Sequence, residues 1–590
     1  MLSGRVALDT ATVATVCAGV RRSGNAVSSP VVSLEEAVAR HVQAGDAVHV
    51  ITGHSRWTAA AREVIRQWWG KEPGFTLVML SLSSLGAVFF RGRLLSKVVT
   101  GYSGDVFPNF TPNKWFGDAY LSGAVDVEHW SFLTFLQRLE AAARGLTAVV
   151  TTSLQGSSMA DNPGFAIGAS PFGGTLGLLA PYAPDLALLH APLADVEGNV
   201  ALSPPLLEGV WGALAARRGA IVTVERVVED IRPWSHLVKI PAHRVLAVCE
   251  TPLGAHPGGL YVPHLPVDAY GEDLEFWEEV RDASRGEDFD AFIDQWVVGP
   301  RDQQDYLDRL GASRLARLRR RAEPDSWRDD EAAHPPDLEE PAGSWERATV
   351  FGARYVADRV IDASYDAVLA GAGVANLCAW LAVRTARQHG SSVVLTAELG
   401  LWGYEPTLAD PFVFNHRSFP SATMVSDSES VLSTLVAGPG TRLLGCLGAA
   451  QIDRAGNINS TVIPGKAFLV GSGGGNDVAS AADEVVVVAT LAPRRTVEEV
   501  PYITSPGERV RAFVTDLVTC ERRDGRLVRT AVPAGGDTIA ERVEVVRQRC
   551  GWELECDERL SEMPEPTPEE LETIRRWDPQ QRFLRPDGGS

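Results

Sequence analysis

Two stretches of the chain read VITGHSRWTAAAREVIRQ (residues 50–67) and VLAGAGVANLCAWLAVRTARQ (residues 368–388). Each begins as an aliphatic strand, passes through a turn that contains glycine, and continues with the spacing of a helix. This order is typical of a βα unit. Its occurrence once in each half of the chain indicates two α/β domains in tandem.

A second pair of segments strengthens this prediction. LLHAPLADVEGNV (188–200) and LGAAQIDRAGNIN (447–459) share the pattern D-x-x-G-N followed by a β-branched residue. Asp195 and Asp453 are 258 residues apart, and so are Asn199 and Asn457. Two similar turns could arise by chance, but the same elements in the same order favour an internal repeat.

The remaining β-rich runs alternate with helical stretches, which predicts mainly parallel βαβ units. In the first half we expect strands at 75–82, 97–100, 148–152, 186–190, 220–224 and 245–248. In the second half we expect them at 367–370, 392–396, 442–447, 467–470, 484–489 and 511–517.

Composition shifts suggest where the domains begin and end. Residues 1–32 show little periodicity and form an expected N-terminal extension, after which Ser33 and Glu36 have the spacing of a capping box. Residues 322–346 are dense in Asp, Glu and Pro, which predicts an unpacked linker. The domains would then cover residues 33–321 and 347–590.

Charge and cysteine content exclude several classes of protein. The chain has 55 basic and 75 acidic residues, a net charge of −20, so nucleic acid is not an expected partner. None of its seven cysteines forms a C-x-x-C pair, and no His/Cys cluster has metal-ligand spacing, so we expect no metal and a reducing compartment. No signal pattern and no apolar run of membrane-spanning length occur, which predicts a cytoplasmic protein without a membrane partner.

Two glycine-containing loops are candidates for chemistry. GHSRW (53–57) resembles a serine nucleophile elbow but has Trp57 where glycine is needed, so a tight turn is the better interpretation. GSGGGN (471–476) would let backbone N–H groups approach an oxyanion or phosphate closely. It completes neither a Walker A loop nor a Rossmann fingerprint, and the alternative is a flexible turn.

Glu398 is the most unusual ionisable residue of the sequence. It ends the aliphatic run VVLTAELG (393–400), and strand ends in open α/β sheets face the ligand crevice. It could serve there as a base or a nucleophile, or it could be an exposed residue at a strand end. His256, within GAHPGG (254–259), is more readily explained as a structural residue.

Several motifs together carry a family resemblance. The first half contains SLEEAVARHVQAGD (33–46) and PLGAHPGGLY (252–261), and the second contains TAELG (396–400), GAAQIDRAGNINST (448–461), GSGGGN, ITSPG (503–507) and WDPQQRF (577–583). Residues 33–318 resemble the α subunit, and residues 350–580 the β subunit, of family I CoA-transferases of the glutaconate CoA-transferase branch. The resemblance implies two related open α/β CoA-transferase domains (NagB/RpiA-like) fused in one chain.

The resemblance also implies a mechanism. Glu398 would attack an acyl-CoA thioester, and a ping-pong exchange would proceed through a glutamyl-CoA thioester. Gly473, Gly474, Gly475 and Gly53 would line the acyl site or bind the oxyanion. The residues expected to contact CoA or substrate are Gly471, Ser472, Asn476, Gln451 and His54. Where the family's α subunits often have a Gly-Gly-Phe type turn, this chain has Thr52, Gly53 and His54, which would change the acyl pocket.

The implied partners are an acyl-CoA and a carboxylic acid, with CoA as substrate and no permanently bound cofactor. A homodimer would be the counterpart of an α2β2 assembly. Two other functions stay open: an acyl-CoA hydrolase of the related ring-degrading branch, which lacks the glutamate found here at Glu398, and a non-catalytic acyl-CoA-binding protein. Aromatic residues near the candidate loops would suit a bulky acyl group, or they belong to the core: Trp57, Phe107, Phe110, Phe172 and Trp402.

Overall fold

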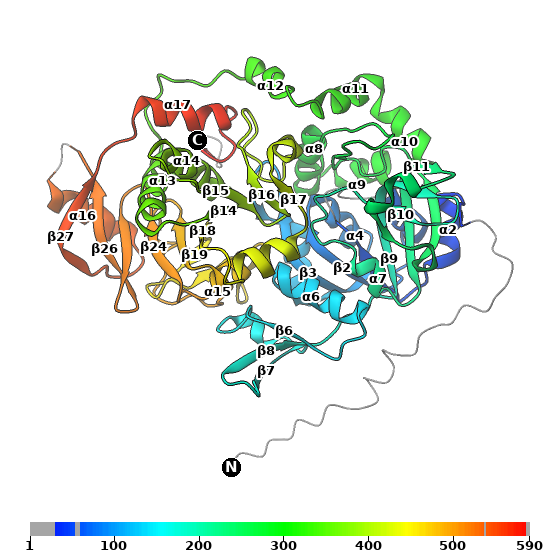
Figure 1. Cartoon of the computed structure of the whole chain (residues 1–590), viewed down its shortest axis with the longest axis horizontal. Coiled ribbons are helices and arrows are strands. Elements are labelled where there is room, and N and C mark those ends of the chain that lie inside the picture. Colours follow the sequence, from blue (N-terminus) through cyan, green and yellow to red (C-terminus); the bar gives the residue numbers. More distant parts are fainter. Residues whose placement is uncertain (1–29, 53–58, 536–537, 586–590) are drawn as a thin grey trace, which may run out of the picture.

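The computed structural model describes residues 30–52, 59–535 and 538–585. They form two α/β halves that lie side by side, each built on a ten-stranded sheet (Figure 1). The tandem α/β arrangement expected from the repeated βα openings is confirmed.

Seven strands of the first sheet pair with their neighbours in parallel. In spatial order they are β13 (Val245–Glu250), β11 (Gly219–Val228), β9 (Leu186–Asp195), β1 (Ala47–Val50), β2 (Phe75–Leu82), β3 (Leu95–Asp105) and β5 (Asp126–His129). Every residue of β9 is buried, as expected for a central parallel strand covered on both faces. Antiparallel additions extend the sheet: β10 (Val200–Ala201), β12 (Val238–Ile240) and β4 (Thr111–Pro112).

Helices connect these strands and pack on the sheet. They are α2 (Leu34–His41), α3 (Ala59–Trp68), α4 (Ala87–Arg91), α5 (Lys114–Ser122), α6 (Phe132–Ala143) and α7 (Trp211–Ala215). Ser33 caps α2 by accepting a hydrogen bond from the backbone N–H of Glu36, as its spacing predicts. The helices α8 (Leu274–Arg285), α9 (Phe289–Ile293), α10 (Gln303–Leu310) and α11 (Ala312–Arg321) end the first half.

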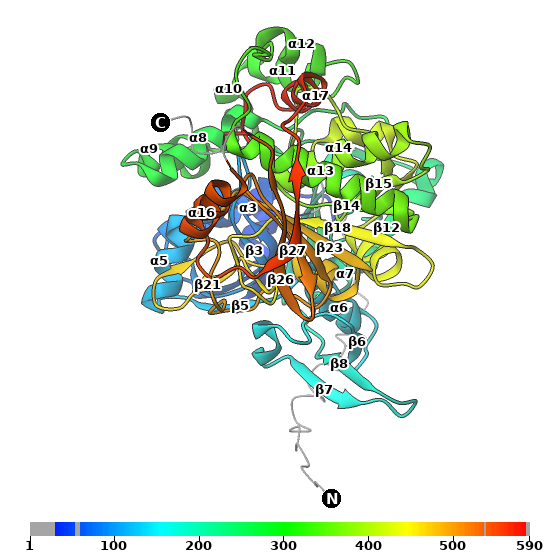
Figure 2. The ribbon, with the colours of Figure 1, turned by 90° about the vertical axis from the view of Figure 1, so that its left-hand side faces the viewer.

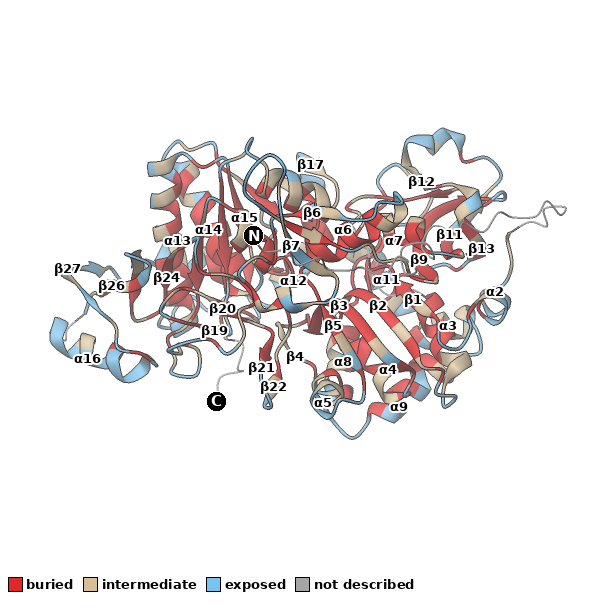
Figure 3. Cartoon of the chain, turned by 90° about the horizontal axis from the view of Figure 1, so that it is seen from below, coloured by how far each residue is buried: buried red, intermediate tan, exposed pale blue. Residues whose placement is uncertain are grey.

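The second sheet has a parallel centre, which antiparallel pairing extends on both sides, and its last strand pairs in parallel with the strand before it. The parallel strands, in spatial order, are β15 (Val394–Ala397), β14 (Ala367–Ala370), β18 (Leu443–Leu447), β23 (Glu484–Val488) and β24 (Val510–Val514). Beyond them lie β16 (Leu401–Tyr404) and β17 (Met424–Val425) on one side, and β25 (Thr519–Arg523), β26 (Arg526–Pro533) and β27 (Cys556–Met563) on the other. The helices are α13 (Ser344–Ala363), α14 (Val374–Gln388), α15 (Gly475–Ala481), α16 (Ile539–Arg549) and α17 (Pro568–Trp577). Figure 3 shows the central strands as buried and α16 as largely exposed.

The D-x-x-G-N repeat has the same geometry in both halves. The Asp195 carboxylate accepts hydrogen bonds from the backbone N–H of Asn199 at 2.8 Å and from its side-chain amide at 2.8 Å. Asp453 makes the same two bonds to Asn457, at 2.9 and 3.0 Å. Each aspartate therefore closes an Asx-type turn at an antiparallel hairpin, which is the physical reason for the shared pattern.

Two predicted strands have partners other than those expected. β6 (Val149–Thr151) belongs to a separate antiparallel sheet with β8 (Thr175–Leu179) and β7 (Phe165–Ala169), and β22 (Ala467–Phe468) pairs only with β21 (Val462–Ile463). Short apolar runs indicate a strand but do not select its partner, which long-range packing decides.

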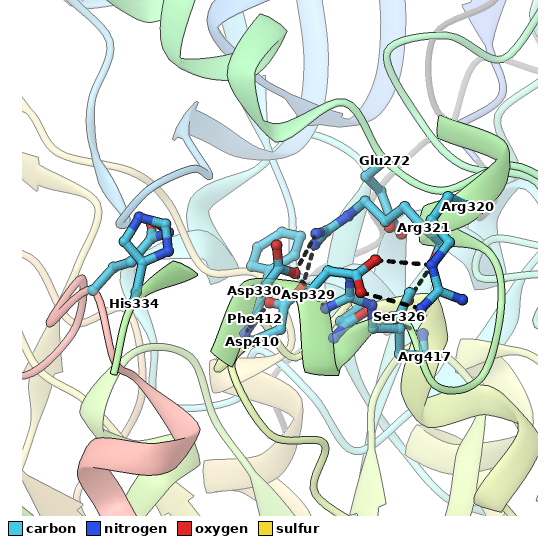
Figure 4. Close-up of polar contacts among 12 residues, drawn as sticks. Glu272, Arg320, Arg321, Ser326, Asp329, Asp330, His334, Asp410, Phe412 and Arg417 are labelled. Atoms are coloured by element: carbon cyan, nitrogen blue, oxygen red, sulfur yellow. Dashed lines mark hydrogen bonds and ion pairs between the residues drawn. The ribbon is translucent and has the colours of Figure 1, made fainter. Parts of the chain in front are cut away.

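The acidic segment 322–346 is not the unpacked linker that its composition suggests. It contains α12 (Trp327–Ala333), and α13 begins at Ser344 within it. Asp330 of α12 pairs with Arg321 at 3.1 Å and with Arg417 at 2.7 Å, and Arg321 also contacts Asp410 (Figure 4). Arginines of both halves therefore neutralise the acidic segment and hold it in place.

Candidate active site

Glu398 lies where the sequence places it, directly after β15 at the carboxyl end of the parallel strands. The chain reverses there into β16 through Gly400, whose φ is +122°. A Cβ on Gly400 would lie 2.6 Å from the carbonyl carbon of Ser426, closer than atoms can approach. The turn that presents Glu398 is therefore possible only with glycine at this position.

The predicted glycine loop meets Glu398. A Cβ on Gly474 would lie only 1.9 Å from Oε2 of Glu398, so the carboxylate occupies the space that a side chain would take. Gly474 is the N-cap of α15, and the start of a helix favours negative charge through its free N–H groups and its dipole. Two motifs separated by more than seventy residues thus form one candidate site.

The glycine loop is anchored to the first half of the chain by backbone hydrogen bonds. Gly473 N–H donates to the carbonyl of Gly101 at 3.0 Å, and Phe132 N–H donates to the carbonyl of Gly473 at 3.0 Å. Ser103 N–H donates to the carbonyl of Val470 at 2.7 Å. Because these bonds join β3 and the start of α6 to the loop, the candidate site lies at the junction of the two halves.

His129 is a residue of this junction that the sequence analysis missed. Its ring lies against Gly471, where a Cβ would be 2.2 Å from Nε2, and Ser472 N–H approaches Nε2 at 3.3 Å. Burial lowers the pKa of His129 to about 4, so the ring is neutral at physiological pH. The one available signal was a histidine at the end of a short β-rich run, DVEH (126–129).

Asn476 and Asp477 join the halves through their side chains. The Asn476 amide, fully buried, accepts from Leu154 N–H at 2.9 Å and donates to the Thr504 carbonyl at 2.8 Å. Asp477 accepts from the Ser131 hydroxyl at 2.6 Å and from Leu133 N–H at 3.0 Å, so it caps α6 of the other half. Burial raises the pKa of Asp477 to about 6. A direct contact of Asn476 with CoA stays a prediction, because its amide already serves the junction.

The other predicted binding residues differ in placement. Ser472 is 9% exposed, and its hydroxyl accepts from Asn476 N–H at 3.3 Å. Gln451, half-buried on β19 (Gln451–Ile452), accepts from the Asn459 amide at 2.8 Å. Gly53 and His54 lie outside the described residues.

A chain of contacts supports the Glu398 turn from the first half. Ser426 N–H donates to the carbonyl of Gly400 at 2.7 Å, and Leu206 N–H donates to the carbonyl of Ser426 at 2.7 Å. Two residues after Leu206, the buried Glu208 carboxylate accepts from Thr52 N–H, at the end of β1. This second carboxylate, which sequence reasoning did not single out, therefore fixes the end of β1 beside the segment that holds the Glu398 turn.

His256 has the structural role that its sequence context favours. It is fully buried, with Nδ1 2.6 Å from the Tyr306 hydroxyl and Nε2 2.9 Å from the Asp273 carboxylate. The aromatic residues near the candidate loops do not form one acyl pocket: Phe107 is buried, whereas Phe172 is 97% exposed on β-hairpin β7–β8. Trp57 lies outside the described residues.

Two kinds of feature are missing from the part of the chain that the structure describes. No three His, Cys, Asp or Glu side chains there are grouped so that they could hold a metal ion. None of the helices described is both long and apolar enough to cross a bilayer.

Comparison with known proteins gives a family match over most of both halves. Residues 31–251 and 356–522 match the family described as Coenzyme A transferase. One subunit of the 3-oxoadipate CoA-transferase from Pseudomonas knackmussii is 30% identical over 291 residues, which cover 47% of this chain and 97% of that protein. The other subunit of the same enzyme is 31% identical over 204 residues, 31% of this chain and 76% of that protein.

Two further proteins are similar. One subunit of the glutaconate CoA-transferase from Acidaminococcus fermentans is 30% identical over 324 residues, 49% of this chain and 95% of that protein. The acyl-CoA transferase YdiF of Escherichia coli O157:H7 has a similar fold, with a TM-score of 0.62 and 14% identity, over 94% of this chain and 98% of that structure. One chain here matches both kinds of subunit.

Proposed function

The chain belongs to the coenzyme A transferase family, with counterparts of both subunits in one polypeptide, and on this premise we propose that Glu398 is its nucleophile. In this proposal the protein moves CoA from an acyl-CoA donor to a carboxylic acid acceptor. The observation that supports it best is the packing of the Glu398 carboxylate against Gly474, at the start of α15.

The reaction consists of two exchanges that share one covalent intermediate. A carboxylate oxygen of Glu398 attacks the thioester carbonyl carbon, the C–S bond breaks, and CoA leaves as thiolate with an acyl-glutamyl anhydride formed. The thiolate then attacks the Glu398 carbonyl carbon, which releases the donor acid and leaves a glutamyl-CoA thioester. An acceptor carboxylate takes the same steps in reverse, so the kinetics are ping-pong.

Each tetrahedral intermediate carries an oxyanion that needs hydrogen-bond donors. The N–H groups of Gly473 and Gly475 are already donated to the carbonyls of Gly101 and Ser472, so the proposed donor of this loop is the N–H of Gly474, at the N-cap of α15. One such donor is typically worth about 2.7–4 kcal/mol in the transition state. Gly53 of the first half stays a proposed second wall of the acyl site, and Gly471, Ser472, Gln451 and His54 stay proposed CoA or substrate contacts.

Covalent trapping tests the nucleophile. After incubation with an acyl-CoA and no acceptor, borohydride or hydroxylamine should modify the peptide that contains Glu398, as read by mass spectrometry. The Glu398→Gln variant should show no adduct and no exchange, whereas the control Glu405→Gln should behave as the parent. Glu405 is a suitable control because it is an exposed glutamate seven residues away.

The same assay separates the alternative functions. Turnover that does not need an acceptor acid would contradict a transferase and indicate a hydrolase. Binding of acyl-CoA without adduct or turnover would indicate a non-catalytic protein. Full exchange by the Glu398→Ala variant would show that the nucleophile is another residue.

A further inference from the structure

A pocket lies in the second half, between α14, α17 and the segment that follows β16. In both Figure 1 and Figure 2, α17 lies beside α14, and the ring of Trp577 at the end of α17 lies 5.6 Å from that of Trp380 on α14. The pocket has a volume of about 500 Å³, within the range of about 300–1,000 Å³ that is typical of small-molecule sites. Its size alone makes it a candidate for a ligand.

The pocket lies at the opposite end of β15 and β16 from Glu398. These two strands pair antiparallel, and the turn between them carries Glu398. Leu395, near the start of β15, and Leu408, after the end of β16, both line the pocket. It is therefore a separate site from the one that contains Glu398.

The floor of the pocket is apolar and largely aromatic. Trp380, Leu395 and Trp577 line it, and all three are buried in the core of the second half. The two tryptophan rings meet at 83°, the edge-to-face arrangement that aromatic rings prefer. Such a floor favours an apolar ligand body, and an aromatic one in particular, because burial removes the body from water and rings pack well against rings.

Two arginines line the polar side of the pocket, and only one of them has a partner. Arg387 pairs with Glu405 at 2.7 Å and donates to the Val393 carbonyl at 2.8 Å. Arg384 is exposed, and among the described residues its side chain has neither an ion pair nor a hydrogen bond. Its guanidinium therefore offers a full charge and several N–H donors, although acidic residues outnumber basic ones 75 to 55 in this chain.

We propose that this pocket binds an aromatic carboxylate, with the carboxylate on Arg384 and the ring against the apolar floor. A planar guanidinium can hold a carboxylate by two parallel hydrogen bonds. A small inorganic anion would leave the apolar floor unused, and an uncharged ring would leave Arg384 unpaired, so the two features together favour a ligand that has both parts. The inference does not depend on the identity of the nucleophile.

Isothermal titration calorimetry with 2-naphthoate tests the site on the full chain. The parent should bind naphthoate, and Arg384→Gln should weaken binding about tenfold or more, because a charge-assisted hydrogen bond is lost. Arg328→Gln on α12 is the matched control and should bind as the parent does. Arg328 is also exposed and also lies near a tryptophan, with its guanidinium 5.5 Å from the ring centre of Trp327, but it does not line the pocket.

The uncharged analogue 2-naphthalenemethanol isolates the role of the charge. It should bind the parent more weakly than naphthoate does, and Arg384→Gln should leave its affinity unchanged, because the analogue has no carboxylate for the arginine to hold. Leu408→Trp, which fills the pocket from a partly buried position, should weaken the binding of both ligands. Circular dichroism and thermal melting establish that each variant is folded.

Three results would overturn the proposal. One is a parent protein that binds no naphthoate at millimolar concentrations. Another is naphthoate binding that both Arg384→Gln and Leu408→Trp leave unchanged, which would place the ligand elsewhere, such as the acyl site. The third is an equal loss of binding in Arg328→Gln, because the effect of Arg384 would then reflect the overall charge of the chain and not a contact in the pocket.

Discussion

At the scale of the residue, the missing side chain of Gly474 decides whether Glu398 can stand where it does. The carboxylate fills the position of a Cβ on Gly474, and the reversed chain after it requires Gly400. A nucleophile gains much of its rate from being held in the right place, so these two glycines matter as much to the proposed chemistry as the glutamate.

We predict that Gly474→Ala lowers kcat roughly 100-fold, since displacement by about 1 Å can cost that much. The Cβ would force the carboxylate away, because it would lie 1.9 Å from Oε2. The control is the exposed Gly440→Ala in the same half of the chain, because nothing lies within 4 Å of the position that its Cβ would take. Steady-state exchange kinetics measure both, and equal effects of the two variants would contradict the prediction.

At the scale of the element, the junction between α6 and the second half contains carboxyl groups that share a small space. Trp211 Nε1 donates to Glu429 at 2.6 Å, and Glu140 of α6 and Asp427 lie close to the same carboxyl. Arg144 pairs with Glu140 at 2.8 Å. Burial and the negative charges of Glu140 and Asp427 raise the pKa of Glu429 to about 7, against the opposing effect of the Trp211 hydrogen bond.

This gives a pH dependence with a definite sign. The folded protein holds the Glu429 proton more tightly than the unfolded chain, whose pKa is about 4.5, so stability is lost as pH rises from about 4.5 to about 7. We predict that Glu429→Gln removes this loss. As pH rises from 5 to 8, the melting temperature of the variant should therefore increase relative to that of the parent.

Glu544→Gln is the control for the Glu429 experiment, because Glu544 is an exposed glutamate on α16, an element that takes no part in this junction. The prediction would be contradicted if the difference in melting temperature between Glu429→Gln and the parent stayed constant across the pH range.

At the scale of the whole molecule, the two halves are held together by more than the covalent connection. Backbone hydrogen bonds join Ser103 to Val470 and Gly101 to Gly473, and Ser158 N–H donates to the Ile503 carbonyl at 2.8 Å. The connecting segment 322–346 also packs on the second half, because Arg575 donates hydrogen bonds to the backbone carbonyls of Asp337 and Glu340 at 2.8 Å each.

We predict that cutting the connection leaves the halves associated and able to exchange CoA. A protease site inserted at residues 334–337, after α12, would be cleaved, and size exclusion at physiological salt should then show one species that contains both fragments. The parent chain treated with the same protease is the control. Separation of the fragments, or loss of exchange on cleavage alone, would contradict the prediction.

Local sequence patterns were sufficient to predict the α/β class, the two halves, and the two motifs that meet at the site. Strand runs, helix periodicity and the D-x-x-G-N turns depend on interactions between residues close in sequence, so they can be predicted from the sequence alone. Glu398 and GSGGGN could be identified for the same reason, since each is unusual in its own local context.

The partners of these motifs could not be predicted in the same way. His129, Asp477 and Glu208 are ordinary in their local sequence and gain their roles from residues far away: Asp477 contacts Ser131 across 346 positions, and Glu208 contacts Thr52 across 156. The pairing of 148–152 outside the main sheet, and the docking of the acidic segment 322–346, also depend on distant partners.

The sequence by itself therefore determined the repeated α/β halves and the chemistry-bearing motifs, because these follow from local periodicity and composition. Only the tertiary structure decided that the carboxylate of Glu398 rests on Gly474, that the first half supports both, and that Arg384 lines a pocket with an apolar floor. The physical reason is that burial and hydrogen bonding between distant segments, which set these positions, are properties of the folded packing and not of any stretch of chain.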